Sequence, residues 1–178
     1  MPTIFTHAVC ATAIGHLYPA RRLPRRFWVL MALCSMLPDA DVLGLFFGIP
    51  YGHLLGHRGL THSLAFAATV GLLCAVLAFR DVRSRVNRAA LGCFIAAATA
   101  SHPLLDALTD GGLGVALFAP FSAGRYFFPW RPIEVSPIGA DFFGARGAAV
   151  LASEFDWVWL PSGALVLAVW VYRFVRSR

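Results

Sequence analysis

Five apolar segments, separated by polar or glycine-rich stretches, organise this chain. They cover approximately residues 3–17, 27–47, 64–79, 89–108 and 157–175. A helix needs about 20 residues to cross the hydrocarbon core of a bilayer, with a range near 17–25. Two of the segments, 3–17 and 64–79, are slightly short, and the others reach that length. The pattern predicts an all-α, polytopic membrane bundle with about five membrane segments.

Local signals predict where two of these helices change. Pro38 lies inside the second segment, next to Asp39 and close to Asp41. Proline has no backbone N–H and its ring clashes with the preceding turn, so the helix should break or kink there and present the two carboxylates. Ser63 or Thr61, just before the third segment, is expected to cap that helix.

The composition agrees with a single integral membrane domain over residues 1–178. Hydrophobic residues make up 58% of the chain, charged residues only 13%, and the mean hydropathy is +0.68. Soluble domains carry about 25% charged residues, and a soluble fold of this size could not bury so much apolar surface. The cysteines lie inside apolar runs without a CxxC pair, so neither a disulfide framework nor a thiolate metal site is expected.

The positive charge predicts a topology. The net charge is +6, and all 15 basic residues are arginines. Three clusters flank the apolar segments: Arg21, Arg22, Arg25 and Arg26; Arg80, Arg83, Arg85 and Arg88; and Arg173, Arg176 and Arg178. Five spans put all three clusters on one side, which the positive-inside rule makes cytoplasmic. The N-terminus is then outside and the C-terminus inside. This distribution is typical of a topology signal and not of a nucleic-acid surface.

The same topology predicts an outer-side loop region, formed by residues 48–63 and 111–156. The second stretch is rich in glycine, proline and aromatic residues. A re-entrant or interfacial piece is expected near residues 115–121, and the last membrane helix is expected to begin near residue 157.

Histidines and aspartates collect toward the predicted outer face. The eight candidate metal ligands are His7, Asp39, Asp41, His57, His62, His102, Asp106 and Asp110. Those inside the second and fourth segments lie roughly 18–25 Å from the inner face, if the segments are helical. Ionisable residues inside a membrane are costly and mark functional sites by default. A set drawn from several segments therefore indicates one site at the outer leaflet.

The spacing of these residues favours metal binding. His102 and Asp106 are four positions apart, so on a helix they share one face and can hold one ion. His57 and His62 lie on a turn that Gly59 permits. Imidazole and carboxylate ligands suit Zn²⁺, and Mn²⁺ or Fe²⁺ accept the same donors. The candidate ligands exceed the needs of one ion, so two or three ions are compatible with the pattern.

Some arginines lie on the predicted outer side, against the positive-inside rule. Arg58 is inside the histidine motif, and Arg125 follows an aromatic stretch. Guanidinium groups recognise phosphate oxygens with two-pronged geometry, so both are candidate substrate-binding residues. Arg58 is also a candidate catalytic residue, together with Asp39 and Asp41, either of which is able to serve as base or as ligand.

These residues give the chain a family resemblance. The motifs are Thr6-His7, Pro38-Asp39-Ala40-Asp41, His57-Arg58-Gly59-Leu60-Thr61-His62-Ser63, His102-Pro103-Leu104-Leu105-Asp106 and Pro120-Phe121-Ser122. They resemble the YdjM/YbcI-like family (DUF457) of bacterial inner-membrane proteins over most of residues 3–122. The resemblance implies a multi-pass protein of the bacterial inner membrane and a metal-dependent hydrolase. It further implies a relation to the zinc-dependent phospholipase C and P1 nuclease superfamily, which holds several zinc ions on His/Asp clusters.

The sequence therefore favours a zinc-dependent phosphoesterase that acts on a lipid or lipid-linked phosphate at the outer leaflet. The alternative is a non-enzymatic membrane protein with a structural metal site, either a transporter or a regulatory scaffold. A transporter would need polar residues that continue to the inner face, and the inner halves of the segments are apolar. The sequence indicates no nucleic-acid partner and no obligate protein partner.

Overall fold

A bundle of helices makes up the protein. The computed structural model describes residues 1–19, 23–137 and 140–177. The α-helices are α1 (Ile4–Gly15), α2 (Arg25–Met36), α3 (Leu43–Phe46), α4 (Leu64–Leu73), α5 (Arg85–Ala107), α6 (Ala145–Glu154) and α7 (Leu160–Arg176). Shorter helical segments join or extend these helices in the described residues. They are the 3-10 turns η1 (Leu37–Val42), η2 (Leu60–His62) and η4 (Ala140–Phe143) and the π-helical segments η3 (Cys74–Ala78) and η5 (Phe155–Trp159). Within the described residues there is no β-strand, only isolated bridge pairs.

Within the described part of the chain, three continuous helical stretches are long and apolar enough to cross a membrane: Arg25–Phe46, Arg85–Ala107 and Ala145–Arg176. Two further apolar helices, Ile4–Gly15 and Leu64–Ala78, are shorter. Each predicted apolar segment is thus helical, and the two segments that looked short are the two short helices. The predicted all-helical membrane bundle is confirmed.

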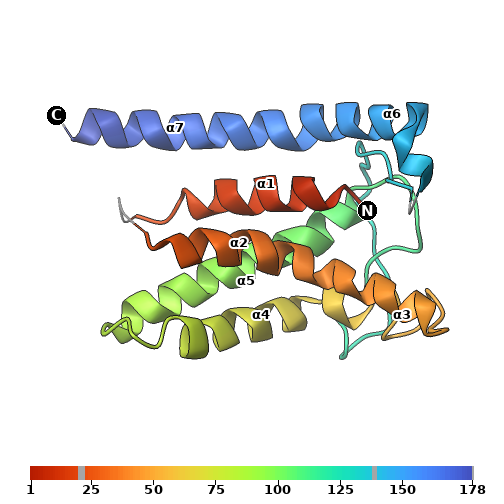
Figure 1. Ribbon diagram of the computed structural model, residues 1–178, viewed down its shortest axis with the longest axis horizontal. Helices are drawn as coiled ribbons and strands as arrows, with labels where there is room; N and C mark the ends of the chain where they lie inside the picture. The colour runs from red at the N-terminus through yellow and green to blue at the C-terminus, as the bar shows by residue number, and fades with distance from the viewer. Residues whose placement is uncertain (20–22, 138–139, 178) are drawn as a thin grey trace.

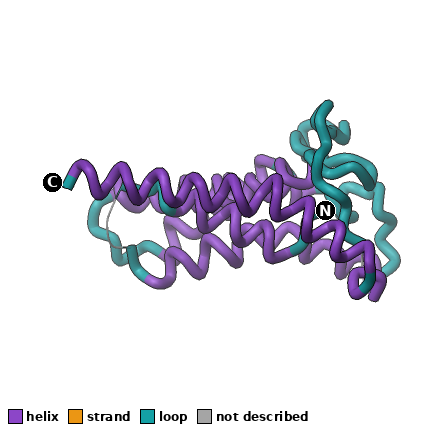
Figure 2. The backbone as a smooth tube through the Cα atoms, turned by 90° about the horizontal axis from the view of Figure 1, so that it is seen from above, coloured by secondary structure: helices purple, strands orange, loops and turns teal. Residues whose placement is uncertain are grey.

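The helices lie side by side along the long axis of the molecule, with connections at both ends (Figures 1 and 2). One end carries the α1–α2 and α4–α5 connections and the C-terminus. We call it the arginine end; its described arginines are Arg25, Arg26, Arg80, Arg83, Arg85, Arg88, Arg173 and Arg176. The clusters therefore share one end, as predicted, although Arg21, Arg22 and Arg178 lie outside the described residues. The opposite end, with the N-terminus, η1, α3 and the loops over residues 47–59 and 108–137, is called the site end.

The break at Pro38 takes the form of a tighter turn. Helix α2 passes into the 3-10 turn η1, which has proline in its first turn, and then into α3. The path of the chain continues along the bundle, while Asp39 is turned inward and largely buried. At the next helix, the Ser63 hydroxyl accepts a hydrogen bond from the Phe66 N–H at 3.0 Å, so Ser63 is the cap of α4.

Apolar side chains fill the bundle between the two ends. Phe27, Met31 and Ile95 are fully buried in one core cluster shared by the helices that precede α6. Helices α4 and α5 pack closely because glycines meet at their crossing. A Cβ atom at Gly71 would lie only 2.5 Å from the Gly92 carbonyl oxygen, so no larger residue fits there.

The last membrane helix is longer than expected. The sequence pattern placed its start near residue 157, but the helix begins at Ala145 and runs through α6, η5 and α7 to Arg176. It lies along the side of the bundle, with α1 as the main neighbour of α7. Only 6% of its most apolar stretch is buried, against 56% for α5. Residues 115–121 form turns and one isolated bridge, from Val115 to Tyr126.

Candidate metal centre

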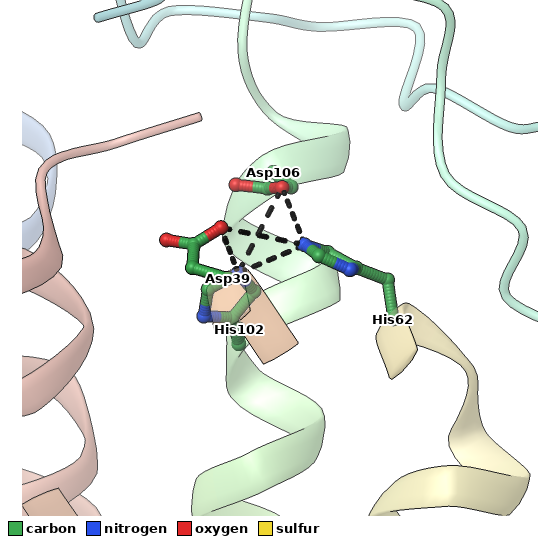
Figure 3. Close-up of side chains that lie close together, drawn as sticks. All are labelled: Asp39, His62, His102 and Asp106. Carbon is green, nitrogen blue, oxygen red and sulfur yellow. Dashed lines mark hydrogen bonds and ion pairs between the residues drawn. The ribbon is translucent and has the colours of Figure 1, made fainter. Parts of the chain in front are cut away.

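Four of the predicted ligands converge at the site end. Asp39 comes from η1, His62 from η2, and His102 and Asp106 from α5 (Figure 3). One donor atom from each lies within 4.8 Å of the others. The His102 Nε2 atom is 3.3 Å from Asp39 Oδ1 and 3.1 Å from His62 Nε2, which in turn is 3.4 Å from Asp106 Oδ2. We call these residues the first ligand group.

The first ligand group is chemically incomplete on its own. Both carboxylate oxygens of Asp39 and both of Asp106 are buried and have no hydrogen-bond partner. Buried polar atoms in native proteins nearly always have partners, and an ionised carboxylate is among the most costly to leave without one. A cation held between the two carboxylates would supply that partner. The donor set of two imidazoles and two carboxylates therefore fits a divalent transition metal.

A second ligand group lies directly beside the first and consists of Asp41, His57 and His62. The Asp41 Oδ1 atom is 2.7 Å from His57 Nδ1, and its Oδ2 atom is 3.0 Å from His62 Nδ1. The Thr61 hydroxyl donates to the same Oδ2 atom at 2.7 Å. Asp41 is therefore fully engaged, in contrast to Asp39. His62 belongs to both groups because its two ring nitrogens face opposite ways.

The carboxylates around His62 create a site for positive charge. Burial by itself would lower the pKa of the imidazole, but contacts with Asp106, Asp39 and Asp41 raise that pKa to about 10. The carboxylates around this ring therefore favour positive charge at His62. A metal ion bound at His62 Nε2 would supply that charge in place of a proton, because ligands must be deprotonated to bind.

His102 is held in the orientation that a ligand needs. Its Nδ1 atom lies 2.7 Å from the Ser35 carbonyl oxygen, so the imidazole donates its proton there. The Nε2 atom then faces the carboxylates with a free lone pair. Metal-binding histidines are usually fixed in this manner through their second nitrogen.

His7 borders the first ligand group but is not one of its four members. Its imidazole stacks on that of His102, with ring centroids 3.6 Å apart and planes inclined by 13°. Its Nε2 atom is 3.8 Å from Asp106 Oδ1, and neither ring nitrogen has a hydrogen-bond partner. The free Nε2 atom of His7 therefore lies on the Asp106 side of the group.

Arg58 is a fully buried partner of the centre. Its Nε atom is 3.3 Å from Asp106 Oδ2, while Nη1 donates to the Gly111 carbonyl at 2.9 Å and Nη2 to the Thr109 hydroxyl at 3.1 Å. Its backbone has a φ of 61°, an unusual value for a residue with a side chain. The next residue must be glycine, because a Cβ at Gly59 would lie 2.1 Å from the Leu54 carbonyl oxygen.

Arg125 lies nearby, but its guanidinium contacts the backbone. It donates to the carbonyl oxygens of Tyr51, His53, His57, Arg58 and Gly114 at 3.2–3.4 Å. Burial lowers the pKa of Arg125, and the neighbouring Arg58 adds to that effect. These bonds join the loop that carries the histidine motif to the loop after α5.

The structure does not bring Asp110 into either ligand group. Its side chain is exposed, and Oδ1 accepts a hydrogen bond from the Val135 N–H at 2.8 Å. Asp110 therefore holds the loop after α5, one turn beyond Asp106.

A buried carboxylate near the centre was not predicted from the sequence. Glu154, at the end of α6, is fully buried and accepts hydrogen bonds from the first turn of α1. The only sequence signal was a lone acidic residue close to an apolar run. Its partners lie near the opposite end of the chain, which no local pattern reveals.

The fold and the centre together define a multi-pass helical membrane protein with a buried His/Asp cluster at one end. The chain matches the YdjM inner membrane protein family over residues 1–178 and belongs to it. It is 42% identical over 171 residues to "Inner membrane protein YbcI" of Escherichia coli (strain K12), covering 96% of this chain and 98% of that one. No solved structure matches. The family and the spans place the protein in the inner membrane.

Proposed function

We propose that this protein is a metal-dependent hydrolase that cleaves a phosphoester bond in a lipid or lipid-linked phosphate at the outer leaflet. The observation that carries the proposal is the first ligand group, in which the Asp39 and Asp106 oxygens are buried without partners beside two imidazoles. Zn²⁺ is the ion we expect, and Mn²⁺ or Fe²⁺ are the other ions that these donors suit.

In this proposal the two ligand groups have different roles. The first group would hold one ion through Asp39, His62, His102 and Asp106, and Asp41 of the second group would orient the His62 ring of that site. A bound ion would lower the pKa of a water molecule and polarise a phosphoryl oxygen. Asp39 is assigned as a ligand because its oxygens have no other partner.

Asp41 is assigned to orientation in the first site. Its two oxygens already contact His57, His62 and the Thr61 hydroxyl. A carboxylate behind a metal-binding histidine fixes the ring and raises its basicity. Asp41 would thus hold the His62 ring so that Nε2 faces the ion.

Arg58 is assigned to charge balance at the reacting centre. Both of its terminal nitrogens donate to protein acceptors, so only Nε faces Asp106. A buried cation at this distance favours the ionised form of Asp106 and the negative charge that develops on a phosphoryl group. We assign Arg125 to the support of the loop that presents Arg58 and His57.

Two features support a lipid phosphate as the substrate. The centre lies at the end opposite the arginine end, which is the outer end if the positive-inside rule holds. Large aromatic side chains stand out from the site end; Phe46, Phe47, Phe121, Trp130 and Phe143 are each more than half exposed. Trp is enriched at the lipid headgroup region, and exposed Phe side chains are typical of surfaces that enter the boundary between headgroups and acyl chains. The family resemblance implies a relation to the phospholipase C and P1 nuclease superfamily, and that relation would favour a phosphoester bond.

The test is a matched pair of variants one turn apart. The parent, Asp106→Asn and Asp110→Asn are purified in detergent, and metal content and release of phosphate or headgroup from a lipid panel are measured. We expect Asp106→Asn to lose metal and turnover, and Asp110→Asn to keep both because it is exposed. If the parent shows no metal-dependent turnover on any lipid phosphate, the hydrolase proposal is wrong.

A structural metal site is the second candidate function, and burial favours it. His62, His102 and Asp106 are all 0% exposed. An ion there would join η1, η2 and α5. In that case chelation would lower the melting temperature, and no substrate would be turned over. The apolar core between the centre and the arginine end, with Phe27, Met31 and Ile95, disfavours a path for ions.

A further inference from the structure

A second buried polar cluster lies beside the metal centre and connects the two ends of the sequence. The Glu154 side chain is fully buried at the end of α6. Its carboxylate accepts hydrogen bonds from the Thr3 hydroxyl at 2.6 Å, from the Thr6 hydroxyl at 2.7 Å and from the Thr3 backbone N–H. Trp159 Nε1 donates to the Thr6 hydroxyl at 2.6 Å.

This carboxylate caps α1 from another helix. Thr3 is the residue before the first turn of α1, and its own side chain makes no capping bond within the helix. The N-terminus of a helix carries partial positive charge and free N–H groups, which an anion satisfies. A buried carboxylate is costly unless it is fully hydrogen-bonded. Glu154 meets that condition only while α1 keeps its present position.

The π-helical segment η5 places Glu154 and Trp159 on the same side. Five residues along a regular α-helix correspond to a rotation of about 140° beyond a full turn, which would point the two side chains apart. In η5 the Leu160 N–H bonds to the Phe155 carbonyl, five residues back. This wider turn reduces the rotation, so both side chains reach Thr6. Such π-turns are frequent at functional sites.

The position of His7 depends on this arrangement. His7 directly follows Thr6, and neither of its ring nitrogens has a hydrogen-bond partner. Its ring lies flat against His102 and 3.8 Å from Asp106. No hydrogen bond at the ring holds it there, so the backbone of the first turn of α1 sets where the imidazole points. Glu154 holds that turn.

We infer that Glu154 is a positioning residue of the metal centre, which holds the first turn of α1 so that His7 faces the ion bound at Asp106. Trp159 and Thr6 extend the same contact. The inference rests on the metal centre of the proposed function and not on its hydrolytic chemistry.

The test uses Co²⁺ as a spectroscopic probe in the full-length protein in detergent. Co²⁺ affinity is measured by competition with a chelator, together with the visible absorption spectrum and the melting temperature. We expect Glu154→Ala to weaken Co²⁺ binding by about 10–100-fold, as for other outer-shell partners, and to change the spectrum. Glu154→Gln should lie between Glu154→Ala and the parent, because it keeps one acceptor oxygen.

Ser153→Ala is the matched control. Ser153 is adjacent in α6, and its hydroxyl accepts from the Glu134 N–H and donates to the Val150 carbonyl oxygen, so these hydrogen bonds do not involve α1. The Ser153→Ala variant should keep the Co²⁺ affinity and the visible absorption spectrum of the parent. A lower melting temperature for Glu154→Ala with unchanged affinity and spectrum would overturn the inference, since Glu154 would then stabilise only the fold.

Thr6→Val covers the case in which Glu154→Ala does not fold. It removes the hydroxyl next to His7 but leaves the Thr3 contacts to Glu154 in place. We expect weaker Co²⁺ binding and a changed spectrum, and parent-like values would overturn the inference. A parent that binds no Co²⁺ would overturn the metal centre and this inference together. A parent that binds Co²⁺ but hydrolyses nothing would overturn the hydrolytic function alone.

Discussion

The two ends of the bundle use charge in opposite ways. At the arginine end, Arg26 and Asp81 pair at 2.6 Å, with side chains 41% and 60% exposed. At the site end, Arg58 and Asp106 lie 3.3 Å apart and both are fully buried. Water screens the first pair, so its loss costs little. The second pair is buried away from solvent, so removing one partner would leave an uncompensated charge, which is costly.

Charged residues at the two ends therefore suit two different roles. The exposed arginines fit a role in topology, for which number and side matter more than geometry. The buried carboxylates and imidazoles are held in a fixed arrangement, and several of their donor atoms have no partner, which suits the binding of a metal ion. The predictions below test that contrast, beginning with the largest effect.

The largest effect is expected for the double variant His102→Ala/Asp106→Ala. Both residues lie on one face of α5 in the first ligand group, so their loss should remove most of the bound metal. Metal content of the purified protein is the measurement. The control is Arg83→Ala/Arg88→Ala, which removes two charges from the other end of the same helix region. Full metal content in the first variant would show that these residues are not ligands.

The next prediction concerns the membrane topology and has an all-or-none outcome. A reporter that is active only in the periplasm should be active when fused after Gly56, at the site end, and silent after Arg85, at the arginine end. The described arginines of the three clusters share the second end, which the positive-inside rule assigns to the cytoplasm. The opposite pattern of activity would reverse the orientation and place the metal centre at the inner leaflet.

Asp41→Asn should have an intermediate effect. Asn keeps the shape of the side chain but loses the charge that orients His57 and His62. We expect metal affinity to fall by about 10–100-fold, since the carboxylate lies behind the ligands. Titration with Zn²⁺ gives both affinity and stoichiometry. Loss of one whole equivalent of metal would instead make Asp41 a direct ligand of a second ion.

The smallest effect is expected for Asp81→Asn at the arginine end. The melting temperature at neutral pH should change by no more than about 2 °C. The hydrogen bond from Arg26 lowers the pKa of Asp81 below its ordinary value of 3.8. The contribution of this pair is therefore present above that value and is lost as the pH falls below it. Parent and variant melting temperatures should converge in acid; a large difference at pH 7 would contradict the contrast between the ends.

Much of the fold followed from the length and spacing of the apolar segments, because a bilayer leaves little choice for a long apolar segment. The break or kink predicted at the proline before Asp39 takes the form of a 3-10 turn inside a continuous helical stretch, and Ser63 proved to be the cap of α4. The early start of the last helix was missed. Residues 145–154 contain Arg146 and Glu154, which lower the apolar signal, although their alanines favour a helix.

The candidate site was predictable in its residue types and not in its contacts. The i, i+4 spacing of His102 and Asp106 brought those two together, since it follows from helix geometry alone. Asp110 continued the same spacing, but α5 ends at Ala107 and the chain turns away. The contacts of Arg125 with backbone carbonyls depend on the paths of two loops. No spacing along the sequence encodes such contacts.

The place of Glu154 along the chain has a consequence for biogenesis. Every candidate ligand precedes α6, so the ligands are synthesised and inserted before the carboxylate that holds the first turn of α1. Chains fold from the N-terminus as they are made. The helices that carry the ligands are therefore inserted first. The first turn of α1 has no contact with Glu154 until α6 has also been inserted. The tightest metal binding would then be reached only after α6 has been synthesised and inserted.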